Sequence, residues 1–131
     1  MPQTTFRTLK ILVVEDQPDV REIIKGILMG MGVAQIFEAE NGHDAIEMIR
    51  KIDDFADIVV CDWNMPQMSG LDVLKEIRTT HPHLPFLMVT GRNDYASVTE
   101  ARDQGVTAYI SKPISSEQLE SKLRTIHRRT A

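Results

Sequence analysis

Five short apolar runs, each followed by a stretch with helical spacing, constrain the fold of this chain more than any other feature. The runs are residues 9–14, 33–39, 58–61, 84–90 and 106–110. They have the length of strands, whereas apolar residues in the stretches that follow recur every three or four positions, as in an amphipathic helix. Strands that alternate with helices form a parallel sheet with helices on both faces. We therefore predict an α/β fold of five strand–helix units.

The same pattern predicts where functional residues lie. A (βα)5 chain commonly forms a flavodoxin-like, doubly wound parallel sheet in the order 2-1-3-4-5. Right-handed crossovers then place the carboxyl end of every strand on one edge of the sheet. Because ligands of such folds bind at that edge, the residues that follow the strands are the candidate functional residues.

Length and composition limit the classes of protein to consider. The 131 residues predict one domain over residues 9–127, with a flexible lead-in at 1–8 and a short tail at 128–131. The formal charge of −4 argues against general attraction to nucleic acid or membrane. A single cysteine, Cys61, favours a reducing, cytoplasmic setting, and no apolar run has the roughly 20 residues of a membrane-spanning helix.

Acidic, hydroxyl and cationic residues stand at the ends of four predicted strands. Glu15 and Asp16 follow the first strand, Asp62 the third and Lys112 the fifth, and Thr90 ends the fourth. Three carboxylates that meet at one edge repel each other unless a cation joins them. An oxygen-only cluster with room for water is what Mg²⁺ prefers. The sequence thus predicts a magnesium site beside a lysine and a hydroxyl.

This combination suits a carboxylate that attacks phosphorus better than a structural salt bridge. Asp62 is the candidate nucleophile, with Mg²⁺ and Lys112 neutralising the charge of the transferred group. A bound nucleotide or flavin is disfavoured because the loop after the first strand, residues 15–19, is acidic and would repel phosphate. The sequence also contains neither GxGxxG nor GxxxxGK[ST].

Four motifs together resemble the response-regulator receiver domain. They are Glu15-Asp16, the stretch from Asp62 to Gly70, Val89-Thr90-Gly91 and Lys112-Pro113. The resemblance covers nearly the whole chain, from about Leu9 to Ile126. The run DWNMP at residues 62–66 and the lack of an output or DNA-binding domain are most similar to CheY-type single-domain receivers.

The resemblance implies a phospho-accepting switch of a two-component system. Asp62 would be phosphorylated by a histidine kinase or a histidine phosphotransfer protein. Mg²⁺ would be ligated directly by Asp16 and Asp62, by the backbone carbonyl of Asn64, and mainly through water by Glu15. Thr90 and Lys112 would contact the phosphoryl group, and the Lys112–Pro113 bond would be cis.

Signal output is also implied by the resemblance. Tyr109 would turn inward when Thr90 moves toward the phosphate, which would remodel the surface of the fourth helix, fifth strand and fifth helix. That surface would bind a protein target, for example a flagellar motor-switch protein, with the receiver acting as a monomer. The alternative for Tyr109 is an edge-strand aromatic with a solvated hydroxyl. Trp63, the single tryptophan, is expected to be partly exposed and to report on Asp62.

Two positions depart from the family pattern. Glu15 stands where the family often has Asp, and Arg92 stands where well-known chemotaxis receivers have Glu. Arg92 reverses a charge beside the site, so the lifetime of the phosphoryl group and any chemotaxis-type phosphatase partner stay open.

Other functions compete with the switch. Within the same class, the chain is either a motor regulator or a phosphorelay shuttle that passes phosphate to a histidine phosphotransferase. A phosphorylation-independent scaffold is disfavoured by the intact acids, Thr90 and Lys112. A metabolic phosphohydrolase needs a second catalytic acid where Asn64 stands. We therefore expect no enzymatic activity beyond self-catalysed phosphotransfer and autodephosphorylation.

Overall fold

The structure is a computed structural model that describes residues 6–52, 55–91 and 94–130, and its strands and helices alternate as predicted. The elements are β1 (Lys10–Val14), α2 (Pro18–Gly30), β2 (Gln35–Ala39), α3 (Gly42–Lys51), β3 (Ile58–Asp62), α4 (Gly70–Thr80), β4 (Phe86–Thr90), α5 (Tyr95–Asp103), β5 (Ala108–Ser111) and α6 (Ser116–Thr130). The expected fourth and fifth helices are therefore α5 and α6.

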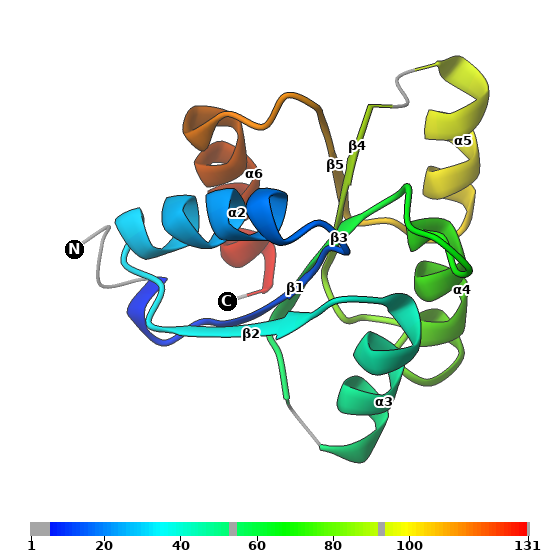
Figure 1. Cartoon of the computed structure of the whole chain (residues 1–131), viewed down its shortest axis with the longest axis horizontal. Helices are drawn as coiled ribbons and strands as arrows, with labels where there is room; N and C mark the ends of the chain where they lie inside the picture. The colour runs from blue at the N-terminus through cyan, green and yellow to red at the C-terminus, as the bar shows by residue number, and fades with distance from the viewer. Residues whose placement is uncertain (1–5, 53–54, 92–93, 131) are drawn as a thin grey trace.

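The five strands form one sheet in the order β2-β1-β3-β4-β5, and every pair is parallel. This confirms the predicted fold class and strand order. Figure 1 shows α2 and α6 on one face of the sheet and α3, α4 and α5 on the other.

Each face of the sheet has its own hydrophobic core. Ile11 and Val13 of β1 pack in the core beneath α2 and α6, whereas Leu12 and Val14 pack in the core beneath α3, α4 and α5. This alternation arises because successive residues of a strand point to opposite faces. Burial on both faces explains why the three central strands, β1, β3 and β4, are continuous apolar runs. Among the described residues there is no helix with the length and apolar character needed to cross a bilayer.

The fifth strand differs from its predicted limits of 106–110, because it spans Ala108–Ser111. The N–H of Val106 donates to the carbonyl of Ala101 at 3.1 Å, and Gly105 has a φ of +89°. Residues 105–106 therefore belong to the turn that ends α5. The shift places Ser111, rather than Ile110, at the end of β5 and Lys112 directly after it.

The amino-terminal segment packs against the last helix. Phe6 lies in the predicted lead-in, yet its side chain is only 2% exposed. The Arg124 guanidinium carbon lies 5.3 Å from the centre of its ring, and the His127 ring centre lies 6.2 Å away. The packed part of the chain thus reaches residue 6, and α6 runs on through residues 128–130 of the predicted tail.

Candidate functional site

The residues predicted at the strand ends converge at the carboxyl edge of the sheet. Asp62 and Thr90 are the last residues of the neighbouring strands β3 and β4. Glu15 directly follows β1 and Lys112 directly follows β5. The N–H of Lys112 donates to the carbonyl of Thr90 at 2.8 Å, which ties the end of β5 to the end of β4.

Three acidic residues form a compact cluster at this edge. Glu15, Asp16 and Asp62 each offer one carboxylate oxygen, and these oxygens lie within 4.8 Å of one another. Glu15 is 0% exposed and Asp62 is 3% exposed. Glu15 Oε1 and Asp62 Oδ1 are buried without a hydrogen-bond partner among the described residues. Since buried polar atoms are nearly always paired, the unpartnered Oε1 of Glu15 beside two further carboxylates indicates room for a cation.

Lys112 supplies one positive charge to the cluster. Its Nζ lies 2.8 Å from Asp62 Oδ1, and the contact is an ion pair that lacks the angles of a hydrogen bond. Burial lowers the pKa of Lys112, but Asp62, Glu15 and Asp16 outweigh it, so the pKa is raised overall. One ammonium group therefore faces three acids. The Lys112–Pro113 bond is cis, as expected.

The acids are held in an environment that disfavours their negative charge. Burial raises the pKa of Glu15 to about 7, and the neighbouring acids Asp62 and Asp16 add to this effect. Burial also raises the pKa of Asp62, which the Lys112 ammonium only partly offsets. Both directions mean that the site gains free energy by taking up a cation.

The donor set fits Mg²⁺. All three side chains offer hard carboxylate oxygens, and Glu15 Oε1 has no hydrogen-bond partner among the described residues. Mg²⁺ prefers such oxygens together with water molecules. Asn64 lies exposed on the loop two residues after Asp62, and the role of its backbone carbonyl as a ligand stays a prediction.

The loop after β3 is folded tightly onto the end of that strand. The N–H of Gly70 donates to the carbonyl of Trp63 at 2.7 Å. A Cβ at Gly70 would collide with the backbone carbonyl of Asp62, so this close approach requires glycine. Ser69 and Asp72 then form a capping box that starts α4. The loop thereby fixes the backbone on which the Asp62 carboxylate stands.

The prediction that Trp63 is partly exposed is wrong. Its side chain is only 5% exposed and belongs to the core beneath α3, α4 and α5. The backbone N–H of Trp63 donates to the carbonyl of Val89 at 2.9 Å, which continues the β3–β4 ladder past Asp62. Because the ladder continues, the pleat turns the indole into the core rather than toward the solvent.

Tyr109 lies in the middle of β5 and is half-buried against the same core. Its hydroxyl is buried and has no hydrogen-bond partner among the described residues, and burial raises its pKa. The alternative of a solvated hydroxyl is therefore wrong for this structure. Its movement as a switch stays a prediction, and Arg92 lies outside the described residues.

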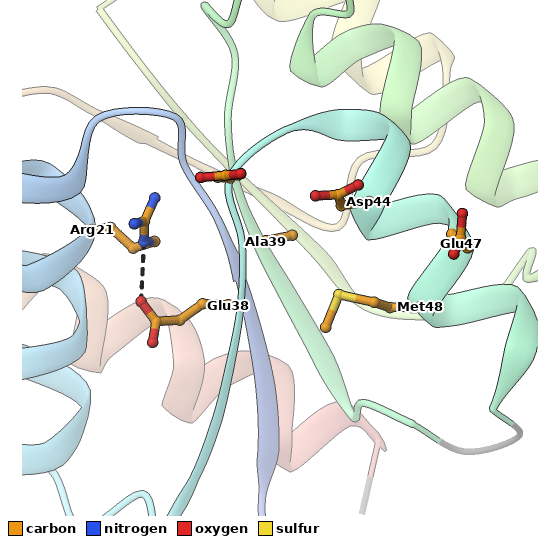
Figure 2. A pocket seen from close by; sticks show the side chains of 7 residues that line it. Arg21, Glu38, Ala39, Asp44, Glu47 and Met48 are labelled. Carbon is orange, nitrogen blue, oxygen red and sulfur yellow. Dashed lines mark hydrogen bonds and ion pairs between the residues drawn. The ribbon is translucent and has the colours of Figure 1, made fainter.

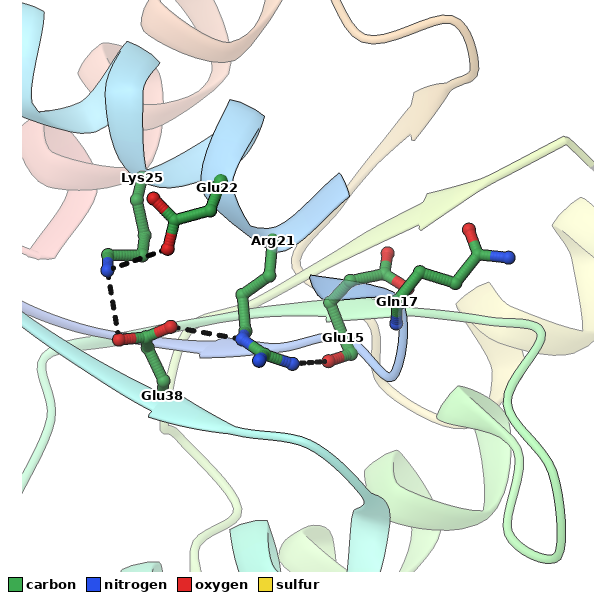
Figure 3. Close-up of polar contacts among 6 residues, drawn as sticks. All are labelled: Glu15, Gln17, Arg21, Glu22, Lys25 and Glu38. Carbon is green, nitrogen blue, oxygen red and sulfur yellow. Dashed lines mark hydrogen bonds and ion pairs between the residues drawn. The ribbon is translucent and has the colours of Figure 1, made fainter. Parts of the chain in front are cut away.

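Sequence reasoning missed Arg21, a residue of α2 that contacts the site through the backbone of Glu15. Its Nη1 donates to the backbone carbonyl of Glu15 at 2.7 Å, and its Nε donates to Glu38 Oε1 at 3.0 Å (Figure 3). The signal in the sequence is Glu38, a charged residue inside the predicted strand 33–39, which a cation on the neighbouring helix can pair with.

A pocket of about 460 Å³ lies beside this contact but not at the acidic cluster. Figure 2 shows Arg21 and Glu38 on one side of it and Asp44 and Glu47 of α3 on the other. Neither Asp62 nor Lys112 lines it. The chemistry therefore belongs to the strand ends and not to this pocket.

Comparison with known proteins gives one family. The model of the response regulator receiver domain matches residues 11–124. The chemotaxis protein CheY-3 of Vibrio cholerae is 42% identical over 125 residues, which cover 94% of this chain and 95% of the relative. The chemotaxis protein CheY of Pseudomonas aeruginosa is 38% identical over 123 residues, which cover 92% of this chain and 98% of the relative.

Solved structures agree with the sequence comparison. A response regulator receiver domain protein from Clostridium thermocellum superposes with a TM-score of 0.86 at 27% identity, over 93% of this chain and 96% of its own. The chemotaxis protein CheY4 of Vibrio cholerae has a TM-score of 0.82 at 27% identity, over 90% of this chain and 98% of its own. The strand order, the acidic cluster at the carboxyl edge of the sheet and these relatives agree. The chain belongs to the response-regulator receiver family and is CheY-like.

Proposed function

We propose that this receiver is a phosphorylation switch in which the Asp62 carboxylate accepts a phosphoryl group in a Mg²⁺-dependent reaction. One observation carries the proposal. Asp62 is buried, its Oδ1 lies 2.8 Å from the Lys112 ammonium, and its carboxylate shares a cluster with Glu15 and Asp16. A structural salt bridge needs one acid and one cation, whereas this arrangement gathers three carboxylates beside one ammonium group.

The residues divide the chemistry between them. An Asp62 oxygen attacks the phosphorus, and the bond from phosphorus to the imidazole nitrogen of a histidine kinase or phosphotransfer protein breaks. Lys112 remains beside the transferred group and neutralises its charge. The Thr90 hydroxyl, at the end of the next strand, donates a hydrogen bond to a phosphoryl oxygen. Bound Mg²⁺ would supply further positive charge for the phosphoryl oxygens.

The same residues limit the activity to a switch. Asn64 stands where a phosphohydrolase would carry its second acid, so hydrolysis of the aspartyl phosphate is slow. The signal leaves through the output face, which we define as α5, β5 and α6. Tyr109 lies in this face with its hydroxyl buried, so a change at Thr90 on the neighbouring strand β4 can alter how it packs. Since the relatives are chemotaxis proteins, we propose a flagellar motor-switch protein as the target.

Phosphorylation by a small-molecule donor tests the proposal. Wild type incubated with acetyl phosphate and Mg²⁺ should gain one phosphoryl group by intact-mass spectrometry, and Asp62→Asn should gain none. Beryllofluoride with Mg²⁺ should also change the fluorescence of Trp63, the single tryptophan. Equal labelling of wild type and Asp62→Asn would place the modification elsewhere, and no labelling of wild type would favour a scaffold.

A second experiment separates the motor regulator from the phosphorelay shuttle. Binding of a motor-switch peptide to phosphorylated wild type, but not to phosphorylated Lys112→Ala, supports the motor regulator. We expect Lys112→Ala to accept phosphate yet fail to pass on the signal, because Lys112 links the phosphoryl group to β5. Rapid return of the phosphoryl group to a histidine phosphotransferase would instead identify the shuttle.

A further inference from the structure

Glu15 is held at three points, which leaves one of its atoms for a ligand. Its N–H donates to the carbonyl of Ala39 at 3.1 Å, and its Oε2 accepts the N–H of Gln17 at 3.2 Å. Its carbonyl accepts Nη1 of Arg21 at 2.7 Å. The remaining polar atom, Oε1, is buried and unpaired among the described residues.

Arg21 is itself fixed by a network of ion pairs between α2 and β2. Its Nε lies 3.0 Å from Glu38 Oε1, and Glu38 Oε2 lies 3.0 Å from Lys25 Nζ. Lys25 also pairs with Glu22 at 3.2 Å. The Arg21 side chain is only 16% exposed, so its guanidinium is constrained (Figure 3).

Arg21 also closes the loop between β1 and α2 through its backbone. Its N–H donates to the carbonyl of Gln17 at 3.0 Å, while its side chain reaches back to the carbonyl of Glu15. One residue thus holds both ends of the three-residue loop that carries Glu15 and Asp16. A planar guanidinium can bind a carbonyl and a carboxylate at once, which a lysine ammonium does less well.

We infer that Arg21 is a positioning residue for the metal site, which fixes the backbone of Glu15 so that its carboxylate faces Asp16 and Asp62. The inference rests on the proposed Mg²⁺ site. It explains how a glutamate serves where a shorter aspartate is common. The extra rotatable bond of glutamate spreads its carboxylate over more positions, and a fixed backbone with the Gln17 hydrogen bond limits that spread.

Charge and positioning make opposite predictions for Arg21. A cation near a Mg²⁺ site repels the ion, so simple removal of the charge strengthens Mg²⁺ binding. Loss of positioning weakens it, because the Glu15 carboxylate is no longer held in place. The direction of the change in Mg²⁺ affinity therefore distinguishes the two roles.

Lys25 is the matched control. It binds the same acid, Glu38, and carries the same charge, but the structure gives it no contact with the Glu15 carbonyl, which accepts from Arg21. The Kd for Mg²⁺ is measured by isothermal titration calorimetry on wild type, Arg21→Gln and Lys25→Gln, at about pH 8 so that the carboxylates are ionised. We expect about tenfold weaker binding for Arg21→Gln, the low end for residues that support metal ligands. Lys25→Gln should bind as tightly as wild type, or slightly more tightly.

Two further variants keep the result interpretable. Arg21→Lys retains the charge but not the guanidinium fork, so it should also weaken Mg²⁺ binding, and it replaces Arg21→Gln if that variant fails to fold. In a Glu15→Ala background, Arg21→Gln should cause no further weakening, because the residue it positions is gone. An equally large weakening in that background contradicts action through Glu15.

The outcomes separate this inference from the proposed function. If wild type binds Mg²⁺ and Arg21→Gln binds it equally or more tightly, Arg21 is not a positioning residue, and the proposed function stands. If wild type does not bind Mg²⁺ at all, both are overturned.

Discussion

At the edge of the sheet where the strands begin, Arg78 of α4 pairs polar groups within the chain. Its Nη1 donates to the carbonyls of His81 at 2.9 Å and Leu84 at 2.7 Å. Its Nε and Nη2 donate to the carbonyl of Gly105 at 3.0 and 2.8 Å. One arginine thus ties together the loops that lead into β4 and β5.

At the opposite edge, where the strands end, Arg21 also binds a backbone carbonyl, that of Glu15, but three acids there share the single ammonium group of Lys112. Glu15 Oε1 and Asp62 Oδ1 have no hydrogen-bond partner among the described residues, and burial raises the pKa of both side chains. The two edges belong to the same sheet and share its core. The difference teaches that the chain completes one edge by itself, whereas the other holds a cluster of acids that the proposed Mg²⁺ ion would complete and stabilise.

The largest effect should come from removing Arg78, at the edge of the sheet where the strands begin. Arg78→Ala removes a donor from three carbonyls, of which, among the described residues, only that of His81 keeps a second donor, the N–H of Leu84, and it should lower the free energy of unfolding by about 3 kcal/mol. Urea denaturation measures the change. Arg50→Ala is the control, because Arg50 forms an exposed ion pair with Glu76 and should cost at most about 1 kcal/mol. Similar losses for both variants would remove the contrast between the half-buried Arg78, with its four hydrogen bonds to carbonyls, and an exposed ion pair.

The next effect concerns the backbone beneath Asp62. In Gly70→Ala the new Cβ meets the carbonyl of Asp62, so the loop must shift. We expect the free energy of unfolding to fall by about 2 kcal/mol and Mg²⁺ to bind more weakly. Gly26→Ala is the control, since Gly26 lies in α2 with nothing near a new Cβ. That helical alanine should stabilise the protein by about 0.5 kcal/mol. A Gly70→Ala protein with wild-type stability would show that the close approach is not required.

The pH dependence of stability should also differ between the edges. A carboxyl with a pKa raised on folding binds more protons in the native state, so stability is full below its unfolded pKa and declines as pH rises through the folded value. Glu15 shifts from 4.5 to about 7, and the pKa of Asp62 moves in the same direction. Without Mg²⁺, the free energy of unfolding should fall by roughly 2 kcal/mol between about pH 5 and pH 8.

Urea denaturation across this pH range checks the fall. Glu15→Gln should show a smaller decrease than wild type, because its amide does not titrate. Saturating Mg²⁺ should flatten the curve, since the ion binds the ionised acids. A wild-type protein that gains stability over this pH range relative to Glu15→Gln would contradict the predicted direction of the change.

The smallest effect is a gain in stability from removing a functional charge. Asp62→Asn should raise the free energy of unfolding without Mg²⁺ by about 1 kcal/mol at about pH 8, because the buried charge is unfavourable despite Lys112. Glu47→Gln is the control, an exposed acid paired with Lys51, and should change stability by less than about 0.5 kcal/mol. Destabilisation by Asp62→Asn would mean that the ion pair outweighs the burial of the charge.

The carboxyl edge, with its cluster of acids, was the more predictable from sequence. Asp62, Thr90 and Lys112 each stand at the end of an apolar run, and a parallel sheet necessarily gathers such ends. The burial of Trp63 was not predictable, because it depends on whether the ladder with β4 continues past Asp62. Arg78 was missed because it binds backbone carbonyls, which leave no mark in the sequence, and Arg21 was missed because only its second partner, the exposed Glu38, is a side chain.

Mg²⁺-linked stability tests the central claim most directly, that the carboxyl edge is completed by a cation. Urea unfolding at about pH 8 is compared in saturating MgCl₂ and in EDTA, for wild type and for the double variant Glu15→Gln/Asp62→Asn. Wild type should gain about 2–3 kcal/mol when Mg²⁺ is near a hundredfold above its Kd, and the double variant should gain almost nothing. Equal unfolding midpoints of wild type with and without Mg²⁺ would contradict the account.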